Sequence, residues 1–122
     1  MSIVNLTVDT FEDTVRASDI VLVDFWAAWC GPCRMFAPVF QAASQKHPDL
    51  VFGTVDTEAE PVLAAQKGIT SIPTLMIFRE NVLVYSEPGA LPGPALEKLI
   101  GAARALDMDA VRAQVAAHQT TS

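Results

Sequence analysis

Hydrophobic and polar positions along the chain predict alternating strands and helices. Residues Ile3–Val8 alternate weakly, as in a strand, and a helix is predicted over Phe11–Ala17 after a start signal at Thr10. A second strand is predicted over Ile20–Trp26. Its first four residues are apolar on both faces, which is typical of a central strand covered on two sides. We therefore expect helices on both faces of the sheet.

The middle of the chain continues this alternation. From Pro32 onward, apolar positions recur at helical spacing and predict a long helix. A third strand is predicted over Leu50–Asp56, and a short helix over Pro61–Lys67. The segments Thr74–Arg79 and Val82–Ser86 are separated by a short polar connection, which predicts an antiparallel hairpin. The sheet should consequently be mixed.

The C-terminal part of the chain predicts helical structure only. A helix beginning at Pro94 carries an apolar stripe that ends at Leu106. The amphipathic stretch Met108–His118 either forms a separate helix capped by Asp107 or continues the preceding one. The last residues, Gln119–Ser122, are expected to form a frayed tail.

Composition narrows the possible functions. With 122 residues and 51% hydrophobic content, the chain fits one compact domain. The net charge is -6 and the eight basic residues are scattered, so nucleic acid is not an expected partner. Residues Met1–Thr10 have neither a basic start nor a long apolar run, and Asp24 interrupts the longest apolar stretch. We therefore expect neither secretion nor membrane insertion.

The two cysteines, Cys30 and Cys33, limit the possible sites. They cannot form a multi-bridge framework or complete a four-cysteine zinc site. A site with two cysteines and two histidines would require the fold to gather His47 and His118, which lack finger-like spacing. Solvated surface imidazoles are the alternative interpretation of both histidines, and no metal is expected.

The segment Cys30-Gly31-Pro32-Cys33 lies where a predicted strand ends and a helix begins. At a helix start, unsatisfied amides and the helix dipole favour the Cys30 thiolate, which makes it the expected nucleophile. One helical turn brings Cys33 close enough to form a disulfide, as the more sheltered, resolving thiol. Gly31 leaves room for a partner, and Pro32 presets the first turn. The alternatives are two inert buried thiols or half of an intermolecular metal site.

Asp24 is unusual because it lies inside an apolar central strand. Burial disfavours the charged form, so this carboxyl should be largely protonated near neutral pH. Asp24 could then exchange a proton with Cys33, its nearest plausible partner for proton transfer. The alternative is that Asp24 points to a polar rim and has no role.

Pro73 directly precedes a predicted strand. It has no amide hydrogen to donate, so it should occupy the first position or the edge of that strand. A cis bond between Ile72 and Pro73 would be rare, and spacing alone does not predict one.

These segments together resemble the bacterial thioredoxin family. The resemblance rests on Val23–Cys33 and on Ser71–Leu75, and it extends from Ile3 to about Leu106. Shorter matches are Ala37-Pro38, Val55-Asp56, Gly68-Ile69 and Gly89-Ala90. The resemblance implies an α/β fold with a central five-stranded mixed sheet flanked by four helices. We expect this thioredoxin domain over residues 1–107, followed by a short C-terminal helical extension and tail over residues 108–122.

The resemblance also implies roles for individual residues. Cys30 is similar to the nucleophile of the family, Cys33 to its resolving cysteine and Asp24 to its buried acid. Pro73 is similar to a cis-proline facing the disulfide, and Ile72 to a residue whose backbone binds an extended substrate. The implied docking surface consists of Trp29, Ile72, Pro73, Gly89 and Ala90.

The implied activity is reduction of protein disulfides by dithiol-disulfide exchange through Cys30 and Cys33. An NADPH-dependent thioredoxin reductase would restore the dithiol, and no bound cofactor is expected beyond the redox-active disulfide. A monomer in the cytoplasm is the implied state. Two departures from the family pattern stand out: Thr54 replaces a lysine that commonly accompanies the buried acid, and Pro88 replaces a β-branched residue before Gly89.

Two other functions compete with disulfide reduction. A non-enzymatic binding module would use the surface around Trp29 and Pro73 and would not need the cysteines. An oxidase or isomerase would run the same chemistry in the opposite direction. Gly31-Pro32 resembles the reducing members of the family, and the expected absence of a leader agrees, because disulfide formation belongs to oxidising compartments.

Overall fold

The computed structural model describes the backbone of residues 3–121 and the side chains of residues 3–117. Within this range a five-stranded sheet has the strand order β1-β3-β2-β4-β5. The strands are β1 (Ile3–Asn5), β2 (Ile20–Trp26), β3 (Val51–Asp56), β4 (Thr74–Arg79) and β5 (Val82–Pro88). The helices are α1 (Phe11–Ala17), α2 (Gly31–Lys46), α3 (Pro61–Gln66), α4 (Gly93–Ala105) and α5 (Met108–Thr121).

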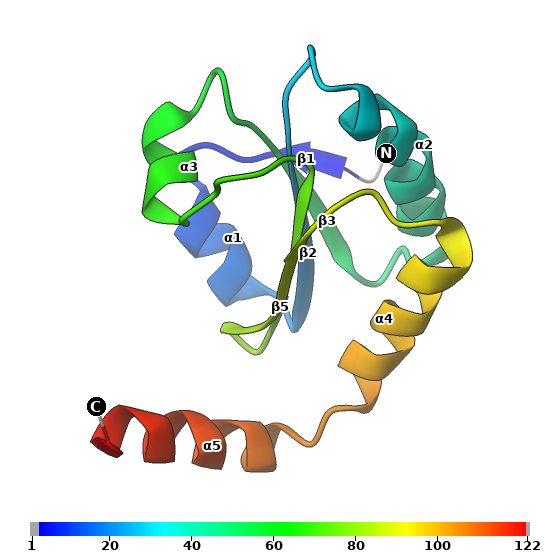
Figure 1. Cartoon of the computed structure of the whole chain (residues 1–122). Helices are drawn as coiled ribbons and strands as arrows, with labels where there is room; N and C mark the ends of the chain where they lie inside the picture. Colours follow the sequence, from blue (N-terminus) through cyan, green and yellow to red (C-terminus); the bar gives the residue numbers. More distant parts are fainter. Residues whose placement is uncertain (1–2, 122) are drawn as a thin grey trace.

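The sheet is mixed, and β2 lies at its centre. Strand β3 runs parallel to β2 and β1, whereas β4 runs antiparallel to both β2 and β5. Helices α1 and α3 cover one face of the sheet, and α2 and α4 cover the other (Figure 1). The predicted architecture is therefore confirmed, with four flanking helices and a fifth helix beyond them.

Side chains of β2 alternate between the two faces of the sheet. Ile20 and Leu22 belong to the apolar cluster under α2 and α4, while Val21, Val23 and Phe25 belong to the cluster under α1 and α3. All five are at most 3% exposed, as expected of a strand covered on both sides. Because side chains alternate, the position after Leu22 on its face is that of Asp24.

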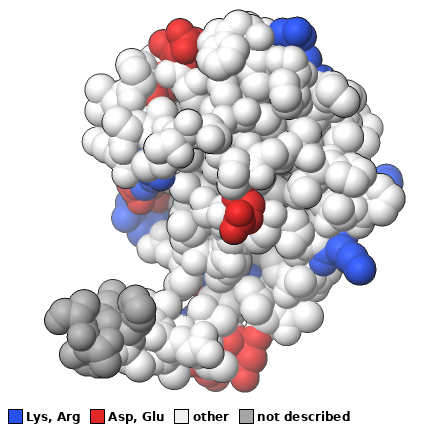
Figure 2. Space-filling view, viewed as in Figure 1, with Lys and Arg blue, Asp and Glu red and all other residues white. Residues whose placement is uncertain are grey.

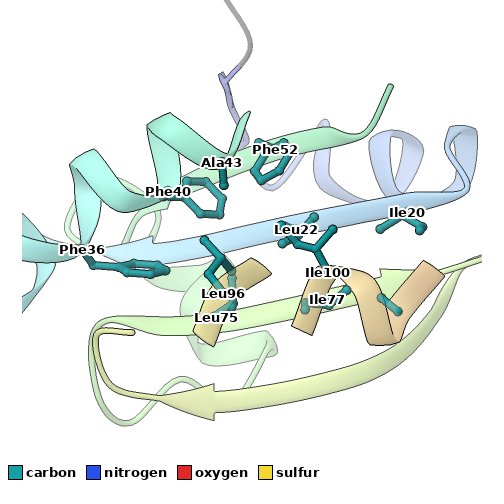
Figure 3. Packing of buried hydrophobic residues seen from close by; sticks show 11 residues of the cluster. Ile20, Leu22, Phe36, Phe40, Ala43, Phe52, Leu75, Ile77, Leu96 and Ile100 are labelled. Carbon is teal, nitrogen blue, oxygen red and sulfur yellow. The ribbon is translucent and has the colours of Figure 1, made fainter. Parts of the chain in front are cut away.

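Aromatic packing fixes α2 on the sheet. Phe36 and Phe40 of α2 are 1% and 2% exposed, and the Phe40 ring meets that of Phe52 edge to face at 5.3 Å (Figure 3). Leu96 and Ile100 of α4 complete the same cluster. Burial of each such side chain stabilises the fold by about 1.5–3 kcal/mol. This packing sets the position of the N-terminus of α2, which holds both cysteines.

Strand β1 is shorter than predicted. It ends at Asn5, because the chain turns at Thr7 instead of continuing to Val8. The Thr7 amide donates to Oγ1 of Thr10 at 3.0 Å, and the Thr7 carbonyl accepts from the amide of Phe11. Helix α1 begins at Phe11 as predicted, but the side chain of Thr10 binds the preceding turn at Thr7 and does not cap the helix.

The β4–β5 hairpin is confirmed and extends further than predicted. Its turn residues Glu80 and Asn81 have positive φ angles of 51° and 67°, which match the twist of the flanking strands. Strand β5 continues to Pro88, which lies opposite Thr74. Proline is tolerated there because β5 is an edge strand.

Helix α5 is separate from α4. Leu106 is extended, and Oδ1 of Asp107 accepts the amides of Asp109 and Ala110 at 3.1 and 3.3 Å. Asp107 therefore caps α5, which decides between the two alternatives left by the sequence. The frayed tail expected from Gln119 is wrong as far as Thr121, since α5 continues to that residue, and Ser122 lies outside the described residues.

Two arginines attach the C-terminal segment to the hairpin. Nη1 of Arg79, at the end of β4, donates to three carbonyls at the C-terminal end of α4 and just beyond it, those of Ala103, Arg104 and Leu106. Arg112 of α5 forms ion pairs with Glu80 of the hairpin turn and with Asp109. Helix α5 consequently lies beside the β4–β5 turn (Figure 1). None of the described helices is both long and apolar enough to cross a membrane.

Candidate active site

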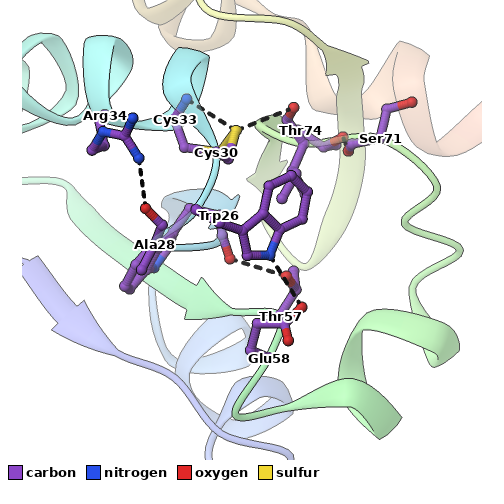
Figure 4. Close-up of a disulfide and its surroundings, with 11 residues drawn as sticks. Trp26, Ala28, Cys30, Cys33, Arg34, Thr57, Glu58, Ser71 and Thr74 are labelled. Carbon is purple, nitrogen blue, oxygen red and sulfur yellow. Dashed lines mark hydrogen bonds between the residues drawn. A yellow bond between two sulfur atoms is a disulfide. The ribbon is translucent and has the colours of Figure 1, made fainter.

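Cys30 occupies the N-cap position of α2. Its backbone is extended, with φ -86° and ψ 114°, and Pro32 lies in the first turn of the helix. The Cys33 amide donates to Sγ of Cys30 at 3.2 Å (Figure 4). An amide donor and the positive end of the helix dipole both stabilise a thiolate at this position. The expectation that Cys30 lies at a helix start is confirmed.

Cys30 and Cys33 form a disulfide with a Cα–Cα distance of 5.2 Å (Figure 4). One turn of α2 provides this separation, as the spacing predicted. The described residues include no free cysteine. They also contain no group of three or more histidine, cysteine, aspartate or glutamate side chains that could hold a metal ion.

The two cysteines are equally buried but face different cavities. Each is 3% exposed, so Cys33 is not the more buried of the pair by this measure. Cys30 lines an open groove of about 480 Å³, whereas Cys33 lines a separate cleft of about 410 Å³. The two cysteines therefore differ in the residues that surround them and not in their exposed fraction.

The groove beside Cys30 joins the active-site loop to the segment before β4. It is lined by Trp29, Gly31 and Pro32 on one side and by Ile69, Thr70, Ser71 and Ile72 on the other. The carbonyl oxygen of Ile72 lies 3.7 Å from Sγ of Cys30. Trp29 is 68% exposed, and its indole N–H donates to Glu58 at 3.4 Å. A segment of another protein lying along this groove would meet Sγ of Cys30.

Pro73 connects the groove to the loop after β5. The Ile72–Pro73 bond is cis, which the resemblance implied and spacing alone did not. The Gly89 amide donates to the carbonyl of Pro73 at 2.8 Å, so the two segments lie side by side. Gly89 has a φ of 110°, a conformation that favours glycine, and Ala90 next to it is exposed. The structure thus brings four of the five expected docking residues into two adjoining segments, with Trp29 across the groove.

Asp24 lies in the cleft on the other side of the disulfide. It is 4% exposed, and its Oδ1 has no hydrogen-bond partner among the described residues. Both Asp24 and Cys33 line this cleft. Burial raises the pKa of Asp24 from 3.8 to about 7. This direction is the one that the sequence indicated, and it allows the carboxyl to exchange a proton near neutral pH.

Thr54 and Arg34 also shape this cleft, and their roles were not evident from spacing. Thr54 is the register neighbour of Asp24 on β3 and lines the cleft beside it. Nη1 of Arg34 donates to the carbonyl of Ala28 at 2.7 Å (Figure 4). Arg34 thereby ties the loop before Cys30 to the first turn of α2. The resemblance had marked Thr54 as a departure, whereas no sequence pattern indicated the contact of Arg34.

Apolar and charged side chains both lie around the site. In the view of Figure 2, uncharged residues cover much of the surface, with acidic and basic groups along the upper edge and one acidic group near the middle. Exposed apolar side chains near the cysteines are Trp29 and Met35, at 68% and 73%. Such a surface favours contact with other proteins through apolar groups.

Comparisons with known proteins agree with this geometry. The thioredoxin family model matches residues 2–102, a range that contains every expected site residue. A putative thioredoxin 2 from Streptomyces coelicolor is 58% identical over 118 residues, which cover 97% of this chain and 88% of that protein. Thioredoxin 1 from Synechococcus elongatus is 51% identical over 89 residues, covering 71% of this chain and 83% of that protein. A solved mutant thioredoxin from Halobacterium salinarum aligns with a TM-score of 0.80 and 30% identity, covering 87% of this chain and 94% of that one.

Proposed function

This chain belongs to the thioredoxin family and is a thiol-disulfide oxidoreductase with a redox-active Cys30–Cys33 pair, and on that premise we propose that it reduces protein disulfides with Cys30 as nucleophile. One observation carries the proposal. The Cys30 sulfur lies at the N-cap of α2 and faces the open groove, whereas Cys33 faces the cleft that holds Asp24. Attack on a target and release of that target are thereby assigned to different sulfurs.

In the reduced enzyme the Cys30 thiolate attacks one sulfur of a target disulfide. A bond forms between Cys30 and that sulfur, and the other target sulfur leaves as a thiolate. The Cys33 thiolate then attacks Sγ of Cys30, the mixed disulfide breaks, and the second target thiolate is released. Two electrons have passed to the target, and the enzyme is left with the Cys30–Cys33 disulfide.

Asp24 serves in this scheme as the base for Cys33. Its pKa of about 7 suits proton exchange near neutral pH, and it shares a cleft with Cys33. The groove residues Trp29, Ile72 and Pro73 hold the target, together with Gly89 and Ala90. In the returning half-reaction, an NADPH-dependent thioredoxin reductase supplies two electrons to the disulfide.

The unit that carries this activity is assigned to residues 1–107, with residues 108–122 as an extension. All proposed site residues lie between Asp24 and Ala90, and the exchange needs no group from a second chain. We therefore assign a monomer as the active state. A reducing compartment such as the cytoplasm suits a protein that must keep both thiols reduced between turnovers.

Equilibration with a glutathione redox series tests the direction of the reaction. We expect the dithiol form to be at least as reducing as the cytosolic glutathione pool. A potential far more oxidising than that pool would contradict the reductase assignment and favour an oxidase or isomerase.

Following NADPH oxidation with a bacterial thioredoxin reductase and a disulfide-bonded protein substrate tests the electron source. A double Cys30→Ser, Cys33→Ser variant should show no turnover.

A further inference from the structure

The cleft beside Asp24 has the features of a small-molecule site. Its volume of about 410 Å³ lies in the lower part of the range of roughly 300–1,000 Å³ usual for ligand pockets. The lining is mainly apolar, with contributions from β1, β2, β3 and α2. The apolar side chains are those of Ile3, Trp26, Ala27, Ala28, Ala37 and Phe40. A compact hydrocarbon group would be desolvated against these walls.

One buried polar group stands out in this apolar setting. Asp24 is 4% exposed and lines the cleft, and its Oδ1 accepts no hydrogen bond from the described residues. Of the cleft-lining residues, Asp24, Cys33 and Arg34 are the ones that titrate or carry charge. Cys33 is held in the disulfide, and Arg34 is exposed and bonded to the carbonyl of Ala28. No cationic side chain is paired with Asp24 in the described chain.

We propose that this cleft binds a small organic ammonium ion, whose apolar body packs on the cleft walls and whose charged group pairs with Asp24. The geometry supplies both halves of the recognition. The walls exclude water from a hydrocarbon body, and the otherwise unpartnered carboxyl accepts a charge-assisted hydrogen bond. A neutral ligand of the same shape would offer only the weaker, uncharged hydrogen bond, and an anionic one would be repelled by the carboxylate.

Oxidised protein with cyclohexylmethylamine provides a direct test. Binding is measured by protein-observed NMR or calorimetry, with cyclohexylmethanol and cyclohexanecarboxylate as isosteric controls. We expect the amine to bind at pH 8 and to perturb resonances of Asp24, Thr54 and Phe40, while the controls bind at least tenfold more weakly. Equal binding of amine and alcohol, or perturbations confined to another surface, would overturn the proposal.

The pH dependence of affinity provides a second test on the unmodified chain. If the ammonium ion pairs only with the carboxylate, a pKa of about 7 for Asp24 predicts about 30-fold weaker binding at pH 5.5 than at pH 8. The probe amine remains charged throughout this range, so the change reports on the protein. An affinity that is the same at both pH values would contradict pairing with Asp24.

Variants locate the binding site. Asp24→Asn should reduce amine affinity to that of the alcohol, because it removes the carboxylate. Thr54→Lys should have the same effect, because residue 54 is the register neighbour of Asp24 and a lysine there would itself supply the ammonium group. Thr54→Val is the matched control, since it keeps a β-branched side chain and adds no cation, and it should change affinity less than about threefold. Asp13→Asn, which removes an exposed carboxylate of α1, should also have no effect. Unchanged binding in Asp24→Asn would overturn the assignment.

Discussion

The two sulfurs of one disulfide lie in contrasting surroundings. Cys30 and Cys33 are equally exposed, at 3%, yet the groove beside Cys30 is open and formed largely by loop residues, while the cleft beside Cys33 holds a buried carboxyl. The groove side offers backbone carbonyls and an exposed indole to a partner. The cleft side offers a single proton acceptor. We therefore expect the reactivity of each sulfur to depend on which groups it can reach, and not on how much surface it presents.

The largest expected effect comes from removing one sulfur at a time. Cys33→Ser should trap targets as mixed disulfides through Cys30, because attack from the groove side persists and nothing resolves the product. Turnover should fall by about a thousandfold or more. Acid-quenched, thiol-blocked lysates on non-reducing gels would show the adducts, and dithiothreitol should release them.

The reciprocal variant is the control for this experiment. Cys30→Ser should trap few targets, because Cys33 faces the cleft and not the groove. If Cys30→Ser gives as many adducts as Cys33→Ser, the two sulfurs do not differ in the way that their surroundings indicate.

Asp24→Asn should slow resolution while leaving attack by Cys30 largely intact. Loss of the base for Cys33 predicts a resolving step that is slower by about 100-fold. The rate of this step should also no longer rise as the pH increases through about 7, the pKa of Asp24. Stopped-flow reduction from pH 6 to 9 measures both effects. A pH profile identical to that of the unmodified protein would show that Asp24 is not the proton acceptor.

The same substitution should stabilise the fold in a pH-dependent way. The pKa of Asp24 is raised on folding, so between pH 4 and 7 the folded state binds more protons than the unfolded state, and stability is lost as pH rises. The full shift corresponds to about 4 kcal/mol, of which an unpaired buried amide would cancel about 1–3 kcal/mol. Denaturant melts should therefore show Asp24→Asn more stable by about 1–3 kcal/mol at pH 8, with the advantage disappearing toward pH 4.

Asp49→Asn is the matched control for stability. A hydrogen bond from Arg104 holds the pKa of Asp49 below its usual range, so the sign of its pH dependence is opposite. Removing that carboxylate should not stabilise the protein, and resolution should be unchanged. A stabilisation as large as that of Asp24→Asn would mean that net charge, and not burial, causes the effect.

Trp29→Ala should affect the groove side alone. Loss of this exposed indole predicts a fall of about 5- to 30-fold in kcat/KM for protein disulfides, corresponding to about 1–2 kcal/mol of docking energy. The rate with a small aromatic disulfide should change little, because such a substrate needs less of the groove. Val115→Ala on α5 is the control, and equal losses for both substrate types would point to a damaged active site.

Removal of residues 108–122 should have the smallest effect on activity. The truncated chain loses buried Met108 and the pairs formed by Arg112, a cost of about 1–3 kcal/mol that comes mainly from Met108. Disulfide reduction should remain within about twofold, because neither cavity beside the disulfide includes this segment. If the truncated protein cannot fold, α5 is part of the folding unit and not an extension of it.

Local chemistry explains why much of this fold and site could be predicted. Apolar residues on both faces of β2 require helices on both sides, and the Cys30–Cys33 spacing requires one helical turn between the sulfurs. Asp24 could be identified as buried because its strand neighbours are. These predictions depend on neighbours in sequence, whose geometry the backbone fixes.

Contacts between distant segments could not be predicted in this way. The cleft joins Ile3, Gln41 and Thr54 around Asp24, and only the register of three strands and the packing of α2 bring them together. The attachment of α5 through Arg112 and Glu80 depends likewise on where the hairpin turn lies. Cys33 is buried as expected, but Cys30 is equally buried at 3%, because position along a helix does not determine what distant segments cover a side chain.

Helix α5 leaves the domain at the end of the sheet opposite the active-site loop, as Figure 1 shows. A tether or dye coupled near its C-terminal end would therefore leave the groove beside Cys30 facing solution. The described residues contain no cysteine besides the reactive pair, so a thiol-directed linker would modify Cys30 or Cys33. A linker that reacts with other groups at this end would leave both thiols free. An immobilised Cys33→Ser protein oriented in this way would serve as an affinity matrix for isolating disulfide-containing targets from cell extracts.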